Sequence, residues 1–263
     1  MLSVVLAVHN EEKNLARCLE AVKDIADEII VVDGESTDDT VKIAKQFKAK
    51  VIKTTNKANF HINKQMAMDA AKGDLVLQLD ADEVVDDELK AFIKKLKSAV
   101  SETLASDIKA WNIKRKNLFL GRWLAKGGQY PDPSIRLYVN GFAKLPQKDV
   151  HEVMTVDGQV GWADGHLLHY ANPTFTDYLR KWNTYTSFKA SQLQESKVKI
   201  SFFSAVEYLF WKPLTTFFGL YIRHRGYVDG LAGFIFAMMS GLHHPMAYLK
   251  LWEQYRLKTK SED

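Results

Sequence analysis

The sequence has little of what several classes of protein depend on. It holds one cysteine, Cys18, among 263 residues, which excludes intrachain disulfides and zinc sites built from several cysteines. No Gly-rich loop of the G-x-G-x-x-G or G-x-x-x-x-G-K-[ST] kind occurs, so any bound phosphate must be held by side chains and metal. The longest uncharged apolar run, residues 231–242, is shorter than the ~20 residues that cross a bilayer. The chain opens without a basic and apolar leader, so we expect no secretory signal and a cytoplasmic protein.

The composition is that of a folded protein with an uneven charge. Hydrophobic residues make up 46% of the chain and charged residues 26%, values that exclude disorder as the main state. The net charge is only +4, yet residues 199–260 hold eight basic and three acidic residues together with 14 of the 30 aromatic residues. Basic and aromatic residues mixed on helices favour an anionic membrane surface as partner. The alternatives are aromatics that pack inward and a dimer interface in a homo-oligomer. We expect no nucleic-acid binding, because no recognition motif accompanies the charge.

The first hundred residues alternate between strand and helix patterns. Continuous β-branched or apolar runs at 3–8, 28–33, 50–53 and 74–80 predict buried strands, and amphipathic segments follow them. Asn10 is predicted to cap the first of these helices. The alternation predicts an α/β fold with a mostly parallel sheet and helices on both faces.

The ends of these strands carry the polar side chains. Ligands of parallel sheets bind beyond the carboxyl ends of the strands. His9 and Glu11 lie at the end of the first predicted strand, Asp33 at the end of the second, and Asp80 and Asp82 at the end of the fourth. Two carboxylates one residue apart are suited to Mg2+ or Mn2+ carrying a phosphate group, although solvated loops also contain this pattern.

The last ninety residues predict helices. A stripe with a three-four spacing is interrupted by Pro213, so we expect two helical pieces there, and Pro245 is predicted to start a last helix. The stripe consists of Phe203, Val206, Phe210, Leu214, Phe217 and Tyr221.

Three motifs in order resemble a family 2 glycosyltransferase of the GT-A fold. SVVLAVHNEEKNLARCLEAV (3–22) resembles the family's opening strand and helix, VVDGESTDDT (31–40) its V-V-D-D-G-S-x-D-x-T signature, and LDADE (79–83) its metal-binding D-x-D. Gly34 departs from the family at the second Asp of the D-D pair, which in many relatives meets the nucleotide base.

Further segments resemble the lipopolysaccharide-core β-1,4-glucosyltransferase branch of that family. They are RKNLFLGRW (115–123), YPDPSIRLY (130–138), VHE (150–152) and GHLLHY (165–170). The resemblance implies a GT-A catalytic domain at 1–172, with a nucleotide-sugar half at 1–100 and an acceptor half at 101–172, followed by a helical extension at 173–263.

The resemblance also implies roles for single residues. Glu152 would be the base that takes the acceptor proton, with Asp132 as the competing base. Asp82, Asp80 and His151 would hold the metal. Lys64 and Arg136 would contact phosphate or lie at the solvated surface, and Asp33 and Glu11 would reach the nucleoside or serve the local turn and helix start. The nucleotide-sugar site is predicted to comprise Val8, His9, Glu11, Asp33, Lys64, Asp80, Ala81 and Arg136.

The function that follows is an inverting, metal-dependent transfer of a sugar. The donor would be a nucleotide-sugar, UDP-linked as in relatives, and the acceptor a lipid-linked glycan such as lipopolysaccharide core. Residues 199–260 would attach the protein peripherally to the inner face of the cytoplasmic membrane. The alternatives are a non-catalytic carbohydrate- or membrane-binding protein on the same fold and a sugar nucleotidyltransferase, although residues 3–14 lack the G-x-G-T-R loop typical of the latter.

Overall fold

The chain divides into two compact units. The computed structural model describes residues 1–57, 59–146 and 153–262, with side chains up to residue 257. The first unit comprises Met1–Arg115 and Asp132–His169, and the second comprises Lys116–Pro131 and Tyr170–Asp263.

A mixed β-sheet forms the centre of the first unit. The sheet order is β3-β2-β1-β4-β8-β6-β11-β5, and β1 to β4 pair in parallel, as the alternation predicts. The strands β8, β6, β11 and β5 include antiparallel pairs, and a separate small ribbon joins β9 to β10. The bounds are β1 Leu2–Val8, β2 Glu28–Gly34, β3 Lys50–Thr54, β4 Leu75–Leu79, β5 Glu83–Val85, β6 Ile108–Phe119, β8 Asp132–Val139, β9 Ala143–Lys144, β10 Thr155–Val156 and β11 Gln159–Asn172.

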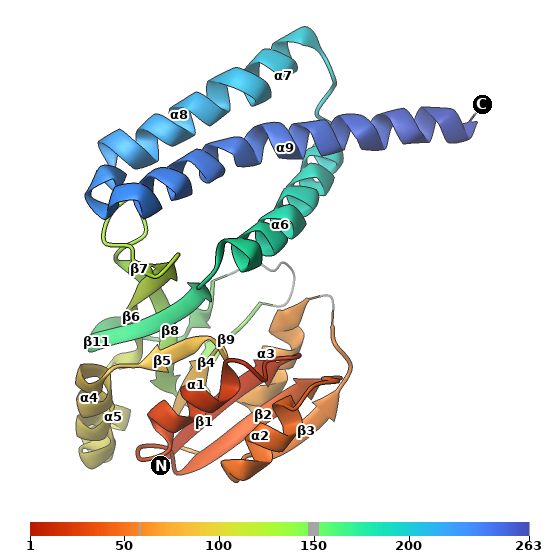
Figure 1. Cartoon of the computed structure of the whole chain (residues 1–263). Coiled ribbons are helices and arrows are strands. Elements are labelled where there is room, and N and C mark those ends of the chain that lie inside the picture. The colour runs from red at the N-terminus through yellow and green to blue at the C-terminus, as the bar shows by residue number, and fades with distance from the viewer. Residues whose placement is uncertain (58, 147–152, 263) are drawn as a thin grey trace. The chain divides into compact units, whose positions relative to one another are not determined.

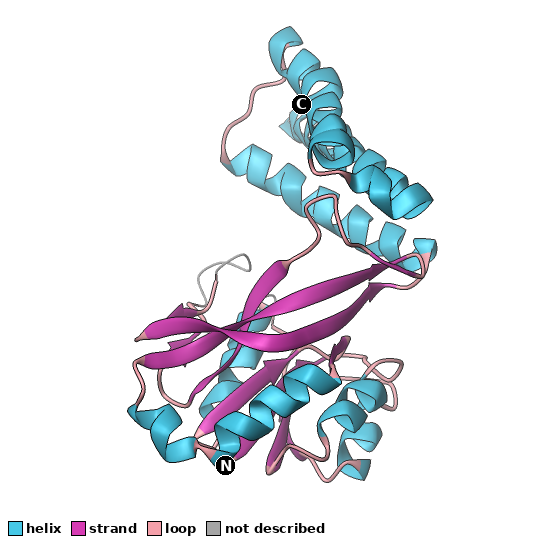
Figure 2. Ribbon diagram, turned by 90° about the vertical axis from the view of Figure 1, so that its left-hand side faces the viewer, coloured by secondary structure: helices cyan, strands magenta, loops and turns pink. Residues whose placement is uncertain are grey.

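Helices cover both faces of this sheet, which confirms the predicted layering (Figure 2). Successive side chains of a strand point to opposite faces. Thus Val4 and Leu6 of β1 pack with α1 and α4, whereas Val5 packs with α3. Both sets are fully buried, which is why β1 is a continuous apolar run. The helices are α1 Leu15–Val22, α2 Thr40–Gln46, α3 Phe60–Asp69, α4 Asp87–Ser98 and α5 Val100–Ala105.

The second unit is mostly helical. A continuous helical stretch from 202 to 223 lies alongside α9 (Figure 1), and α6 also packs on α9. Within the described residues, no helix is both long enough and apolar enough to cross a bilayer. The elements are the short strand β7 Arg122–Trp123, α6 Phe175–Glu195, α7 Phe202–Val206, the π-helical turn η1 Glu207–Trp211, α8 Lys212–Phe218, the π-helical turn η2 Gly219–Arg223, the 3-10 turn η3 Gly226–Asp229 and α9 Gly230–Glu262.

The structure confirms one predicted proline position and corrects the other. Pro213 lies in the first turn of the second helical piece, α8, as the sequence predicts. Pro245 starts no helix but lies inside α9. An internal proline removes one backbone hydrogen bond and crowds the preceding turn. Here the buried contacts that Ala247, Tyr248 and Leu251 of α9 make outweigh that cost.

We predict that Gly165 of β11 tolerates no side chain. Its φ is +86°, and an added Cβ would lie 2.7 Å from Leu89 Cα and 2.6 Å from Asp86 Oδ1. Gly165→Ala should therefore lower the free energy of unfolding by roughly 2–5 kcal/mol, from backbone strain plus overpacking. Gly141 is the matched control, because its φ is +87° and an added Cβ would meet nothing within 4 Å. Gly141→Ala should cost roughly 1–2 kcal/mol. Equal costs in urea unfolding would contradict the steric argument.

Candidate active site

The ends of β1, β2 and β4 lie side by side at one edge of the sheet. The parallel register pairs Val8 with Asp33 and Leu6 with Leu79, so the residues after each strand come together. Asn10 joins two of these ends, because its N–H donates to Ser36 Oγ (2.9 Å) and its Oδ1 accepts from the N–H of Thr37 (2.8 Å). The predicted cap at Asn10 is therefore wrong. Asn10 has a φ of +55°, and α1 begins only at Leu15.

The predicted nucleoside contacts all lie at this edge. Asp33 is buried, and its Oδ1 accepts from the N–H of Ser36 at 3.3 Å. Glu11 accepts from Asn14 Nδ2 (2.9 Å) immediately before α1, and His9 Nδ1 lies 2.6 Å from the carbonyl oxygen of Gly34. Val8 and Ala81 are also buried at the ends of their segments. These bonds show that Asp33 serves the turn at Ser36 and that Glu11 serves the start of α1. Contacts of these residues with a nucleoside stay predictions.

Asp80 lies between two cations. Lys64 Nζ of α3 is 2.5 Å from Asp80 Oδ1, and Arg136 Nη2 of β8 is 2.6 Å from Asp80 Oδ2. Arg136 also donates to Gln78 Oε1 and, at 3.0 Å, to Glu83 Oε1. The side chains of Lys64 and Arg136 are about nine-tenths buried, so the alternative that they lie at the solvated surface is wrong.

A chain of ion pairs extends from Asp80 to Asp132. Arg115 Nη1 of β6 lies 3.3 Å from Glu83 Oε1, and Glu83 has no exposed surface. The same guanidinium donates from Nε (2.9 Å) and Nη2 (2.7 Å) to Asp132 Oδ2. Cations and carboxylates thus alternate along the edge, and Asp132, one of the two predicted bases, is held there by Arg115.

The charges of this network are fixed by their partners. Burial by itself would raise the pKa of Asp80, but the neighbouring Arg136 and Lys64 outweigh it and hold that pKa far below its ordinary value. Burial would likewise lower the pKa of Arg136, yet Asp80 and Glu83 raise it above its ordinary value. Asp80 therefore stays an anion and Arg136 a cation at any physiological pH.

Asp82 has a partner that the sequence did not reveal. His169 Nε2 lies 3.5 Å from Asp82 Oδ2, and both side chains are 18% exposed. The antiparallel pairing of β5 with β11 places His169 opposite Glu83 and hence beside Asp82. A carboxylate oxygen and an imidazole nitrogen at this separation can bind one divalent ion. The predicted metal ligand His151 and the predicted base Glu152 lie outside the described residues.

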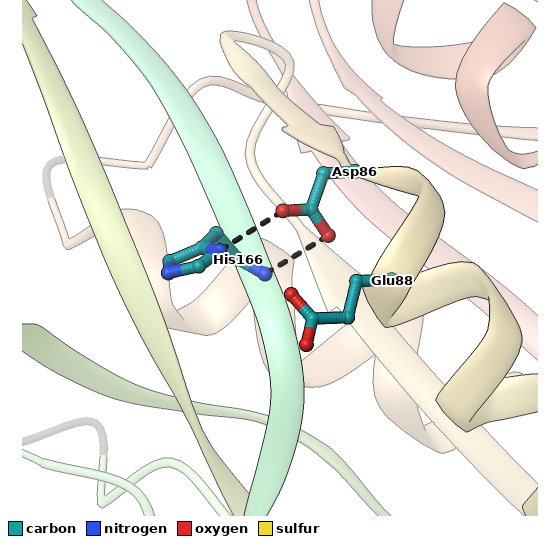
Figure 3. A group of neighbouring side chains, drawn as sticks. All are labelled: Asp86, Glu88 and His166. Atoms are coloured by element: carbon teal, nitrogen blue, oxygen red, sulfur yellow. Dashed lines mark hydrogen bonds and ion pairs between the residues drawn. The ribbon is translucent and has the colours of Figure 1, made fainter.

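A second group of side chains of the kinds that bind metal ions lies where α4 meets β11 (Figure 3). Asp86, Glu88 and His166 each offer a ligand atom, all within 4.8 Å of one another. Asp86 Oδ2 is 3.0 Å from His166 Nδ1, while its Oδ1 accepts from the N–H groups of Leu89 and His166. Asp86 therefore already caps α4 and fixes it to the strand, so we read this group as structural.

Comparisons with known proteins found similar sequences and structures. Residues 3–152 match the family model described as glycosyl transferase family 2. An uncharacterized glycosyltransferase of Rickettsia typhi is 30% identical over 96% of this chain and 87% of its own length. The lipopolysaccharide core biosynthesis glycosyltransferase LpsC of Rhizobium meliloti is 29% identical over 98% of this chain and 94% of its own. Among solved structures, S. aureus TarS 1–349 in complex with UDP is 17% identical, covers 97% of this chain and 89% of that one, and has a TM-score of 0.48.

We predict that replacing Arg136 lowers the free energy of unfolding, because Arg136 joins the carboxylates at this edge of the sheet. Arg136→Met would leave the buried carboxylate of Glu83 with one cationic partner, Arg115, and Asp80 with one, Lys64. Breaking a buried pair in this way costs about 3–5 kcal/mol of unfolding free energy, measurable by urea titration. Lys42→Met is the control, because Lys42 pairs with Asp39 where both side chains are more than 60% exposed. It should cost less than about 1 kcal/mol. Similar costs for the two variants would contradict the ion-pair argument.

Proposed function

Since the chain belongs to glycosyl transferase family 2, we propose that it moves a sugar, with inversion, from a UDP-linked donor to a lipid-linked glycan of the cell envelope. The protein is a glycosyltransferase, as its motifs predict. The observation that carries the finer proposal is the pairing of Asp82 with His169 at the edge where three strand ends meet.

Asp82 and His169 suit a divalent ion. Two ligands that bind one ion at about 2.1 Å stand about 3–4 Å apart, and the observed separation of 3.5 Å lies in that range. We assign Mg2+ or Mn2+ to this pair, with the predicted third ligand His151 from outside the described residues. When bound, the ion would neutralise charge on the leaving diphosphate. Asp80, already between two cations, would instead hold Lys64 and Arg136 in place.

The donor would lie across the strand ends. Lys64 is the cation closest to Asp80, and a lysine ammonium is an ordinary phosphate partner. Asp33 and Glu11 supply carboxylates for the hydroxyls or N–H groups of a nucleoside, and His9 lies beside them. Together these groups would hold the diphosphate and the nucleoside in one orientation, which is the positioning that transfer needs.

The chemical step needs a base on the acceptor side. The acceptor hydroxyl loses its proton to Glu152 as its oxygen attacks the anomeric carbon, and the bond from that carbon to the diphosphate oxygen breaks as UDP leaves. Attack from the face opposite the diphosphate inverts the anomeric centre. Asp132 is the competing base, but its Oδ2 accepts two hydrogen bonds from Arg115, which favours a structural role and leaves Glu152 as our choice.

The acceptor assignment rests on similarity and on the second unit. The relative from Rhizobium meliloti, similar over nearly the whole of both chains, is named for lipopolysaccharide core biosynthesis. Such acceptors carry lipid anchors, so the enzyme would work at the inner face of the cytoplasmic membrane. The basic and aromatic residues of 199–260 would attach it there.

Removing the Asp82 carboxylate should abolish most transfer without unfolding the protein. Asp82→Ala is expected to lower kcat/KM with a UDP-sugar by about 100-fold or more, because charge on the leaving group is no longer neutralised. His169→Ala should weaken activity in a way that added Mn2+ partly restores. The control is Asp87→Ala, which removes the same charge from a 99% exposed side chain nearby. Full activity of Asp82→Ala, with an unchanged melting temperature, would remove the metal assignment.

Glu152→Gln should separate turnover from donor binding. Loss of the base should reduce turnover by about 10²–10⁴-fold while the Kd of UDP stays nearly constant, because the base acts on the acceptor. Asp132→Asn is the comparison, and its melting temperature must be followed because Arg115 loses a partner. If only Asp132→Asn removes turnover, with fold and UDP binding preserved, then Asp132 is the base.

A further inference from the structure

The helical stretch 202–223 of the second unit turns large apolar side chains to the outside. Phe203 is 83% exposed, Phe210 62% and Leu214 54%. Contiguous apolar surface of this kind marks a binding face. We call these residues the outward apolar face: Phe203, Val206, Phe210, Leu214, Phe218 and Ile222, with Phe202 and Trp211 beside them.

Two π-helical turns keep this face on one side. From Val206 to Ile222 the exposed residues recur every fourth position, which in an ideal α-helix would rotate the row by about 160°. The turn η1 lies within that span and η2 begins within it, and both wind more loosely than an α-helix. Consequently Phe217 and Tyr221, which continue the ideal stripe, turn inward to the ring of Phe234 at 5.7 and 5.6 Å between centroids.

The opposite side of the stretch directs its polar groups inward. Ser204 Oγ is 2.9 Å from Tyr248 Oη, and Thr216 Oγ1 is 3.0 Å from His244 Nε2, so hydroxyls point at α9. Gly241 of α9 lets the backbones approach at Pro213, where an added Cβ would stand 2.7 Å from the Pro213 carbonyl oxygen. The inner side thus combines aromatic residues with hydroxyls that need partners, while the outer side carries large hydrocarbon groups. A helix whose outer side faces water carries polar residues there instead.

Cations frame the outward apolar face. Lys199 precedes the stretch, Arg223 ends it and Arg225 follows it, and all three are exposed. The acid Glu207 is neutralised by Lys212 at 2.8 Å. A two-fold pairing of this face with a second copy would bring cationic ends against cationic ends, which is unfavourable. Anionic headgroups beside a hydrocarbon layer complement both the charge and the apolar surface.

We infer that the outward apolar face inserts into the headgroup–acyl boundary of an anionic membrane, with the stretch 202–223 in the membrane plane and Lys199, Arg223 and Arg225 on the headgroups. The inference rests on the proposed function for the presence of a lipid-linked acceptor. It goes further in naming the inserted residues. It also makes apolar burial, and not charge alone, the force that keeps the protein attached.

The test is vesicle co-sedimentation of the full chain. Phosphatidylglycerol–phosphatidylcholine vesicles are used at 0.1 M and 1 M NaCl, where the Debye length falls from about 10 Å to about 3 Å. Wild type should bind less at 1 M but keep a salt-resistant fraction. Phe210→Gln/Phe218→Gln should reduce the partition coefficient at 1 M at least about tenfold, since two apolar side chains no longer leave water. Its melting temperature should not change, because both side chains are exposed.

A matched control variant and a measurement of how deeply tryptophan enters the bilayer complete the vesicle experiment. Tyr185→Gln/Phe188→Gln changes two exposed aromatic residues of α6 in the same unit and should bind as wild type does. Vesicles with brominated acyl chains should quench tryptophan emission, and Trp211→Phe should remove most of that quenching, because Trp211 flanks the inserted face.

Three outcomes would overturn the insertion. They are complete release of wild type at 1 M NaCl, equal loss of binding in both double variants, and a wild-type dimer in sedimentation velocity that Phe210→Gln/Phe218→Gln makes monomeric while vesicle binding stays unchanged. Hydrolysis of a UDP-sugar, which needs no lipid acceptor, should be the same in wild type and this variant. Its absence in wild type would overturn the proposed function while the vesicle results still decide the insertion.

Discussion

The buried guanidinium of Arg136 is the interaction on which the edge of the sheet depends. It contacts Asp80 and Glu83, which follow β4 and begin β5, from a strand more than fifty residues later in the chain. Taking these charges out of water costs several kcal/mol each, which only close pairing offsets. The parallel and antiparallel halves of the sheet are therefore joined at the point where the proposed donor would bind.

Asp82 gains its position from that network without being part of the Asp80 pairs. Asp80 and Glu83, which flank this position in the chain, pair with the cations Lys64, Arg136 and Arg115. Asp82 lies near His169 instead. The partner of this carboxylate is an imidazole, and an imidazole nitrogen and a carboxylate oxygen are both ligand types that divalent ions accept. The two aspartates of one D-x-D motif thus differ in what surrounds them and, in our proposal, in what they do.

The helical unit differs from the sheet unit in which kind of group it leaves exposed. The first unit buries the charges of Glu83 and Arg136 and must pair them, whereas the stretch 202–223 exposes its hydrocarbon and hydrogen-bonds inward to α9. In our proposal, the sheet binds the soluble donor and the helical surface brings the enzyme to an acceptor anchored in lipid.

The sequence by itself determined the parallel half of the sheet, the helices on both of its faces, the polar strand ends and the family, because these depend on local periodicity and on short motifs. Only the tertiary structure decided that His169 meets Asp82, since this follows from the pairing of β5 with β11, strands far apart in the chain whose register no local pattern sets. It likewise decided that Asn10 joins two turns, that Pro245 sits inside α9, and that Phe218 and Ile222 face outward where the ideal stripe names Phe217 and Tyr221. For Asn10 and Pro245, contacts between distant segments outweigh a local preference of about 1–3 kcal/mol.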